Sequence, residues 1–324
     1  MQKPTIAVRF IDDNTTYYLS SNFIWEWPLF HTFDKEFLNQ HQLPSTHIPY
    51  RNEPTQSVEG KTLHTLLEEL VREVQAGKKV FTHFTVLGDR TSCTKLRAGS
   101  LILTCNKYPF VIKLFIENPE IFVKPLKKGG FQGFASFIIQ LVCGGINRHL
   151  AGFTRIKNLL TIKALIAQNP KWAERIDLPR KWFWTPSNSK GLIITGNNFE
   201  SKNLCITIPS IYCIIADAIE SEKIMHWSHA NDRASLKKMA LTAFDFCKDI
   251  DFRIDVNPNN FIIERNTKKI VVIDTEHLPT LAGITRRPKN ISGLVSFAWF
   301  LLKNSALNLI YGPLEKMGNP FDSQ

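Results

Sequence analysis

The sequence Arg-Ile-Asp-Val-Asn-Pro-Asn-Asn-Phe-Ile-Ile occupies residues 253–263, and Ile-Val-Val-Ile-Asp-Thr-Glu follows at residues 270–276. Both segments contain short runs of β-branched and aromatic residues, and the polar residues between them are typical of a hairpin turn. The stretch therefore predicts two antiparallel strands. Asp255 and Asn260 precede the first strand and Asp274 follows the second, so we expect the hairpin to bring all three to one edge.

These three side chains carry oxygen atoms that suit a divalent metal. Mg²⁺ takes carboxylate and amide oxygens as ligands, and the phosphates of a substrate often complete its coordination. An aspartate that does not hold the metal is free to orient or deprotonate an attacking hydroxyl group. The alternative is an ordinary surface hairpin with acidic ends, because Asp-x-x-x-x-Asn alone is a weak motif. The spacing to Ile273-Asp274 favours a site.

The segment 255–263 resembles the catalytic loop of the protein-kinase-like superfamily, where Asp-x-x-x-x-Asn is followed by the aspartate of the metal-binding motif. The resemblance implies that Asp255 is the catalytic base and that Asn260 and Asp274 are metal ligands. Glu276 is a further candidate metal ligand. The cofactors implied are ATP and one or two Mg²⁺ or Mn²⁺ ions.

The departures from the kinase pattern bear on the phosphate acceptor. Arg253-Ile254 replaces the usual His-Arg, and Asp274-Thr275-Glu276 replaces the usual Asp-Phe-Gly. The pattern Ile-Asp-x-Glu is closer to phosphotransferases of the aminoglycoside and choline type. The expected acceptor is therefore a hydroxyl group of either a protein or a small molecule.

Two upstream residues are candidates for nucleotide binding. Lys113 lies alone within an apolar strand pattern, where an unpaired ammonium group is costly, so we expect an anionic partner for it. By the resemblance, Lys113 holds the nucleotide phosphates, as the lysine of the third kinase strand does. Gly88 lies where the glycine-rich loop is expected, although this chain has one glycine there instead of three.

The glutamate that usually pairs with such a lysine is missing from the expected helix. Residues 121–173 contain no aspartate or glutamate. The candidate substitutes are Glu117, Glu120 and Gln140. This departure favours an atypical or inactive site.

The expected fold class is α+β: a bilobal protein-kinase-like fold with a small antiparallel-sheet N-lobe, a minimal helical C-lobe and an N-terminal extension. The expected domains are the extension at 1–78, the N-lobe at 79–208 and the reduced C-lobe at 209–324, since only fifty residues follow Asp274. Helices are predicted over 63–74, 134–142, 156–168, 210–221 and 232–247, and strands over 80–87, 100–105, 110–115, 182–184, 191–195 and 204–209.

Composition limits the class of protein. The 324 residues are 44% hydrophobic and 21% charged, which predicts a globular chain with substantial cores. The six cysteines show no Cys-x-x-Cys spacing, which argues against a zinc site or a disulfide framework. No signal peptide is visible, and the apolar window 291–310 is interrupted by polar residues. We therefore expect a cytoplasmic or otherwise intracellular protein without a transmembrane segment.

The net charge of +11 is concentrated in one segment. Residues 121–190 contain twelve lysines and arginines against two acidic residues, which gives +10. Such a segment predicts affinity for a phosphate-rich ligand, such as a nucleotide, an inositol phosphate, a nucleic acid or an anionic membrane. The alternative is a solvated basic surface that serves solubility only.

Three functions remain open at this stage. The first is a divergent kinase-like phosphotransferase that uses ATP and a divalent metal. The second is a pseudokinase that binds a nucleotide or phosphoanion as a regulatory module. The third is a basic protein that binds anionic lipid or nucleic acid.

Overall fold

The computed structural model describes residues 5–10, 17–20, 35–87, 100–116, 145–189, 191–196, 204–222, 230–252, 254 and 260–275. Over these residues the chain is α+β, with mainly antiparallel sheets and few helices. It divides into two compact units: unit 1 contains residues 1–154 and 180–218, and unit 2 contains residues 155–179 and 219–324. These limits differ from the predicted boundaries of 1–78, 79–208 and 209–324. The assignment of those ranges to an extension, an N-lobe and a C-lobe stays a prediction.

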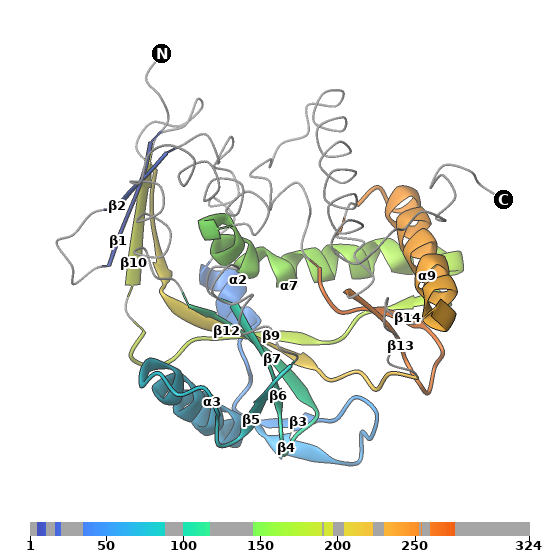
Figure 1. Cartoon of the computed structure of the whole chain (residues 1–324), viewed down its shortest axis with the longest axis horizontal. Helices are drawn as coiled ribbons and strands as arrows, with labels where there is room; N and C mark the ends of the chain where they lie inside the picture. Colours follow the sequence, from blue (N-terminus) through green and yellow to red (C-terminus); the bar gives the residue numbers. More distant parts are fainter. Residues whose placement is uncertain are drawn as a thin grey trace. The chain divides into compact units, whose positions relative to one another are not determined.

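A five-stranded antiparallel sheet forms the centre of unit 1 (Figure 1). Along the sheet the strands follow the order β5, β6, β7, β12 and β9, so the last strand in sequence lies between the third and the fourth. Lys113 of β7 is the register partner of Ile102 on one side and of Ile214 on the other. The strands are β5 (Phe84–Val86), β6 (Ser100–Cys105), β7 (Phe110–Ile116), β9 (Lys181–Trp184) and β12 (Ile211–Asp217).

The helix predicted over 210–221 is wrong, because residues 211–217 form the strand β12. β12 pairs with β7 and with β9, and nearly all its residues are buried. A strand that is covered on both faces reads as a continuous apolar run, and periodicity alone does not separate such a strand from a buried helix. The β-branched residues Ile211, Ile214 and Ile215 favour the strand.

A second sheet of unit 1 joins the start of the chain to residues near 200. β1 pairs with both β2 and β10, and β10 pairs with β11, all antiparallel. The predicted strands over 191–195 and 204–209 are confirmed, but they lie in a different sheet from β9. The strands are β1 (Thr5–Phe10), β2 (Tyr17–Ser20), β10 (Gly191–Gly196) and β11 (Leu204–Pro209).

The predicted helix over 63–74 is confirmed as α3 (Gly60–Gln75), which packs on the five-stranded sheet. Leu63, Leu67 and Leu70 lie on one helical face and are at most 3% exposed. They share one core cluster with buried residues of β6 and β7. Two further elements precede α3: the helix α2 (Lys35–Gln40) and the hairpin of β3 (His47–Pro49) with β4 (Ser57–Glu59).

α7 (Gly145–Ala167) is longer than the predicted helix over 156–168, and the boundary between the two units falls within it. Its first part approaches β12 closely at Gly152. A Cβ atom added there would lie 1.8 Å from the hydroxyl oxygen of Tyr212, whose ring stacks on Phe115 with centroids 4.6 Å apart. Glycine is therefore required at this helix position by the backbone-to-ring contact. The helix predicted over 134–142 lies outside the described residues.

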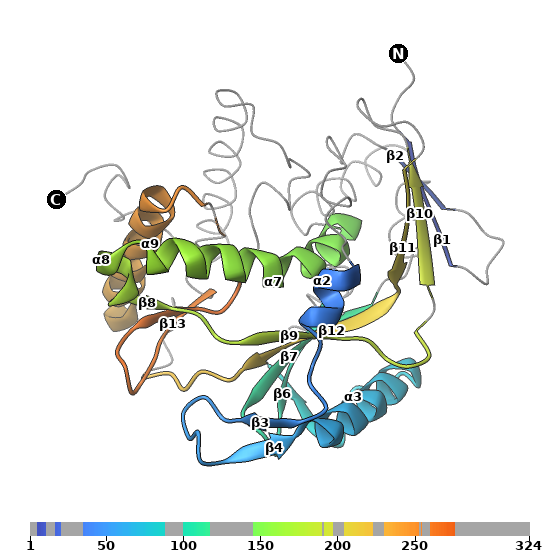
Figure 2. The same cartoon turned by 180° about the vertical axis from the view of Figure 1, so that it is seen from behind.

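Unit 2 is built from a small sheet and the helices packed on it (Figure 2). β14 pairs antiparallel with β13 and parallel with β8. The helix predicted over 232–247 is confirmed as α9, and its residues Leu236, Met239 and Ala243 share a core with β13, β14 and β8. The remaining elements of the unit are α8 (Pro170–Ala173), β8 (Ile176–Asp177), α9 (Ala230–Asp249), β13 (Phe261–Ile263) and β14 (Ile270–Val272).

None of the helices in the described part of the chain has the length and apolar composition that a membrane span needs. The window 291–310 lies outside that part.

The end of α3 is held by Glu73. The backbone N–H of Lys78 donates to the carbonyl of Glu73 and that of Gly77 to Val74, with Gly77 at φ +74°, which is a Schellman ending. The Glu73 carboxylate accepts hydrogen bonds from the Thr82 hydroxyl at 2.6 Å and from Lys78 Nζ at 3.0 Å. These two bonds, together with the backbone N–H of Thr82 and the charge of Lys78, lower the pKa of Glu73 to about 2. The carboxylate thus ties the helix end to the chain that enters β5.

We predict that Glu73→Gln removes part of the acid sensitivity of unit 1. Because the folded pKa lies below the ordinary value of 4.5, the charged carboxylate stabilises the fold above pH 4.5, and this contribution is lost as the pH falls toward 2. Urea unfolding at a series of pH values should show the wild type converging on the variant over this interval. Glu59→Gln, at the exposed start of α3, is the control, and equal pH profiles for wild type and Glu73→Gln would contradict the role.

Candidate functional site

The hairpin of β13 with β14 places Asn260 and Asp274 at the same end. Phe261 pairs with Val272, and one residue further the N–H of Ile273 donates to the carbonyl of Asn260 at 2.9 Å. Asp274 follows Ile273 directly. The predicted hairpin is therefore confirmed and brings Asn260 and Asp274 to the same end, whereas Asp255, the third residue of the prediction, lies outside the described residues and metal binding stays a prediction.

Core packing fixes this edge of the hairpin. Val271 and Val272 are 0% exposed and Phe261 is 4% exposed. Ile254, the residue before Asp255, is also fully buried and belongs to the same core cluster. The backbone on both sides of the candidate site is thus anchored by apolar side chains.

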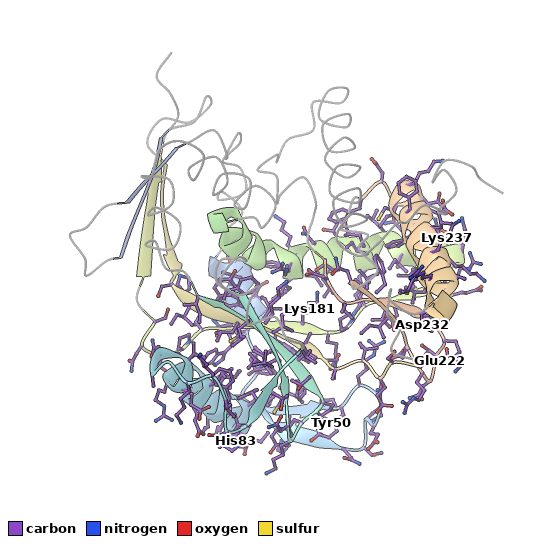
Figure 3. The ribbon with its side chains drawn as sticks, in the orientation of Figure 1. Tyr50, His83, Lys181, Glu222, Asp232 and Lys237 are labelled. Carbon is purple, nitrogen blue, oxygen red and sulfur yellow. The ribbon has the colours of Figure 1, made fainter. Side chains whose placement is uncertain are left out.

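The opposite end of the hairpin is closed by its own hydrogen bonds. The N–H of Glu264 donates to the carbonyl of Lys269 at 2.9 Å, and the buried Glu264 carboxylate accepts from the Thr267 hydroxyl at 2.6 Å. Lys268 adopts the left-handed backbone conformation, with φ +59°, and pairs through Nζ with Glu222 at 2.6 Å (Figure 3 labels Glu222). The register of the two strands is therefore set from both ends.

Asp274 is held by a buried arginine of α7. The Nε atom of Arg155 donates to Oδ1 of Asp274 at 3.1 Å, and Arg155 is 1% exposed while the Asp274 side chain is 18% exposed. The Thr275 hydroxyl donates to the carbonyl of Arg155 at 2.8 Å, and Nδ2 of Asn158 donates to the carbonyl of Thr275 at 2.9 Å. Three contacts therefore bind residues 274 and 275 to α7.

Sequence reasoning missed Arg155, Asn158 and Thr275 as parts of the site. From the sequence, Arg155 counts only as one of the twelve basic residues of 121–190. The sequence carries little signal for this role, because Arg155 is one of several basic residues of the helix, with Arg148, Lys157 and Lys163, and the pattern does not say which of them meets a carboxylate.

Asn260 and Asp274 carry the types of oxygen atom that a hard cation takes as ligands. Asn260 offers an amide oxygen and Asp274 a carboxylate, which are ligands that Mg²⁺ and Mn²⁺ take, with substrate phosphates completing the shell. Among the described residues no group of three or more His, Cys, Asp or Glu side chains is placed to hold a metal. Asp255 and Glu276, the two further acidic candidates, lie outside the described residues.

Lys113 lies in the middle of β7, as the strand pattern predicted, and is half-buried. Its Nζ atom lies 5.7 Å from the centroid of the Phe115 ring, within the range of a cation–π contact. Lys113 belongs to unit 1 and the hairpin to unit 2. Gly88 and the candidate partners of the lysine, Glu117, Glu120 and Gln140, lie outside the described residues.

The basic segment 121–190 is partly neutralised by acidic residues from elsewhere in the chain. Besides Arg155 with Asp274, Lys171 Nζ pairs with Asp249 at 2.8 Å, and Arg180 pairs with the buried Asp217 at 2.7 Å. Lys181, labelled in Figure 3, is itself buried. Within the described part of the segment, residues 145–189, some basic side chains are thus paired or buried, while Lys157, Lys163 and Arg175 are exposed.

Comparisons with known proteins give one weak match. No model of a known protein family matches the chain, and no curated protein matches it. The complex of Rv3197 with erythromycin from Mycobacterium tuberculosis is similar at 14% sequence identity, over 87% of this chain and 65% of that chain, with a TM-score of 0.29. This chain thus spans slightly under two thirds of that protein, and the match gives no clear assignment to the kinase-like superfamily.

We predict that Thr275→Val lowers the free energy of unfolding of unit 2 by about 0.5–1.5 kcal/mol, the usual net contribution of one hydrogen bond. Valine keeps the shape of the fully buried threonine but cannot donate to the Arg155 carbonyl. Thr275→Ser keeps the hydroxyl and is the comparison that separates the hydrogen bond from packing. Urea midpoints measure both, and a larger loss in the serine variant would show that the methyl group matters more than the hydroxyl.

Proposed function

We propose that the protein is a divergent kinase-like phosphotransferase that uses ATP and Mg²⁺ or Mn²⁺ to phosphorylate a hydroxyl group of a protein or small molecule. One observation carries the proposal: the hairpin that holds Asn260 beside the residue preceding Asp274, with Asp255 five positions before Asn260. This is the order and spacing of base, metal ligand and metal ligand in the kinase pattern.

The antiparallel sheet of unit 1 supports the same proposal. Lys113 lies on the third strand of that sheet in sequence order, and α7 follows before the fourth strand. A lysine on a third strand is the position that grips nucleotide phosphates in the kinase pattern. The backbone amides near Gly88 are the expected second contact to the phosphates.

Each residue of the proposed site has a separate task. Asn260 and Asp274, with Glu276 as a further ligand, hold the divalent metal, which when bound offsets the negative charge of the phosphates. Lys113 binds the phosphates electrostatically. Asp255 orients the acceptor hydroxyl and receives its proton, so positioning and electrostatics supply most of the rate acceleration.

A pseudokinase is the second candidate function, and one contact favours it. The carboxylate of Asp274 is already paired with a permanently charged, buried guanidinium group, which lowers its attraction for a metal. The absence of acidic residues from 121–173 and the single glycine at Gly88 point the same way. ATP binding without phosphate transfer to any of a broad set of acceptors would select this function.

A basic protein that binds anionic lipid or nucleic acid is the third candidate. It predicts binding that weakens steeply with salt and does not depend on Asp255. The ion pairs of Arg155, Lys171 and Arg180 with acidic residues outside the basic segment reduce the support for it.

We predict that Asp274→Ala abolishes the metal dependence of ATP binding, because it removes the carboxylate that would hold the metal. Calorimetric titration with ATP, in Mn²⁺ and in EDTA, measures this dependence. Asp249→Ala is the matched control, since it removes an aspartate that pairs with Lys171 in the same unit. An unchanged metal effect in Asp274→Ala would remove the kinase proposal.

We predict that Asp255→Asn lowers phosphate transfer by roughly 10²–10⁴-fold, the usual cost of losing a positioned general base. The affinity for ATP and metal should stay close to that of the wild type, because the amide keeps the size of the side chain. Autophosphorylation or ATP hydrolysis is measured together with the melting temperature. If Asp255 only caps the loop, the variant loses stability while transfer per folded molecule is unchanged.

A further inference from the structure

We propose that Arg155 is a positioning residue that competes with the divalent metal for the carboxylate of Asp274, and so couples metal binding to α7. The proposal rests on the proposed function, because it concerns how the same metal site is regulated. It assigns to α7 a control over Asp274 that the kinase resemblance does not describe.

The pairing of Arg155 with Asp274 is the first support. The contact joins Nε and Oδ1 at 3.1 Å, and the arginine is 1% exposed. A guanidinium group keeps its positive charge in any protein environment, and a buried charge interacts with its neighbour more strongly than an exposed one. A metal that takes Asp274 as a ligand therefore has to share or displace an existing cation.

The backbone on both sides of Asp274 is fixed, which leaves the side chain as the element that changes partner. Before it, the N–H of Ile273 donates to the carbonyl of Asn260. After it, Thr275 is fully buried, donates to the carbonyl of Arg155, and accepts from Asn158. The carboxylate can therefore exchange the guanidinium for a metal without any change in the hairpin.

Competition for one carboxylate acts in both directions. If Arg155 weakens the binding of the metal by a certain factor, the metal weakens the contact of Arg155 with Asp274 by the same factor. Metal binding therefore weakens the contact that α7 makes through Arg155, the residue at which the helix enters unit 2. A partner or modification that moved this part of α7 would change metal affinity in turn.

The test compares two substitutions that differ in charge. Arg155→Gln removes the cation, and Arg155→Lys keeps it. The measured quantity is the affinity for ATP in Mn²⁺ divided by the affinity for ATP in EDTA. A substitution that changes the metal-free binding of ATP by the same factor in both conditions leaves this ratio unchanged. Arg155→Gln should raise this ratio by roughly 5- to 150-fold, the usual range for coupling between two ligands, whereas Arg155→Lys should stay close to the wild type.

Two further variants separate the competition from changes in stability. Asp249→Ala removes the ion pair with Lys171 elsewhere in unit 2 but leaves the pair of Arg155 with Asp274, so it should lower the melting temperature and leave the ratio unchanged. Asp274→Asn should lose the metal dependence whatever residue stands at 155. Calorimetry on the full chain measures all of these variants.

The outcomes distinguish this proposal from the proposed function. A metal effect that depends on Asp274 but is no larger in Arg155→Gln overturns the competition and leaves the phosphotransferase intact. If the metal changes ATP binding neither in the wild type nor in Arg155→Gln, the competition and the phosphotransferase proposal are both overturned. Should Arg155→Gln not fold, the Nε–H resonance of Arg155 in the wild type decides, because Mg²⁺ with ATP should speed its hydrogen exchange, and an unchanged rate overturns the proposal.

Discussion

The antiparallel pairing of β13 with β14 is the constraint on which the candidate site depends. It brings Asn260 and Asp274, fourteen positions apart in the chain, to one end of a hairpin whose residues Phe261 and Val272 are buried in the core of unit 2. Since a shift of one residue would turn Val272 and Phe261 out of that core, the register is strongly specified. The polar edge is thus held both by the apolar burial of the hairpin and by the contacts of residues 274 and 275 with α7.

Charge balance at this edge explains why the site stays open to two functions. An aspartate beside a buried arginine is stable without a metal, and the same aspartate beside a bound metal is the ligand that phosphoryl transfer needs. Under the proposed function, the strength with which Arg155 holds this carboxylate is one of the factors that separate an active enzyme from a pseudokinase, together with the missing acidic residues of 121–173 and the single glycine at Gly88. Two other basic residues of the segment 121–190, Lys171 and Arg180, are also paired with aspartates.

Both units combine local contacts with pairings between distant segments, and in unit 2 β14 pairs with β8 more than ninety positions earlier. In unit 2, the hairpin is local, and its turn is closed by Glu264, Thr267 and Lys269 within a few residues. In unit 1, β12 pairs with β7 about a hundred positions earlier, and β1 pairs with β10 nearly two hundred positions later. The proposed lysine of β7 is therefore supported by a strand that no local pattern connects with it.

The sequence by itself determined the local elements: the hairpin, α3, α9 and most strands, together with the nearness of Asn260 to Asp274. Short-range hydrophobic periodicity and turn composition encode such elements, because the interacting residues are close in the chain. Only the tertiary structure decided that residues 211–217 form the central strand β12 and that Arg155 is the partner of Asp274. A buried strand and a buried helix share one apolar pattern, and an arginine can pair with any carboxylate that the fold brings within reach, so both outcomes depend on contacts between distant segments.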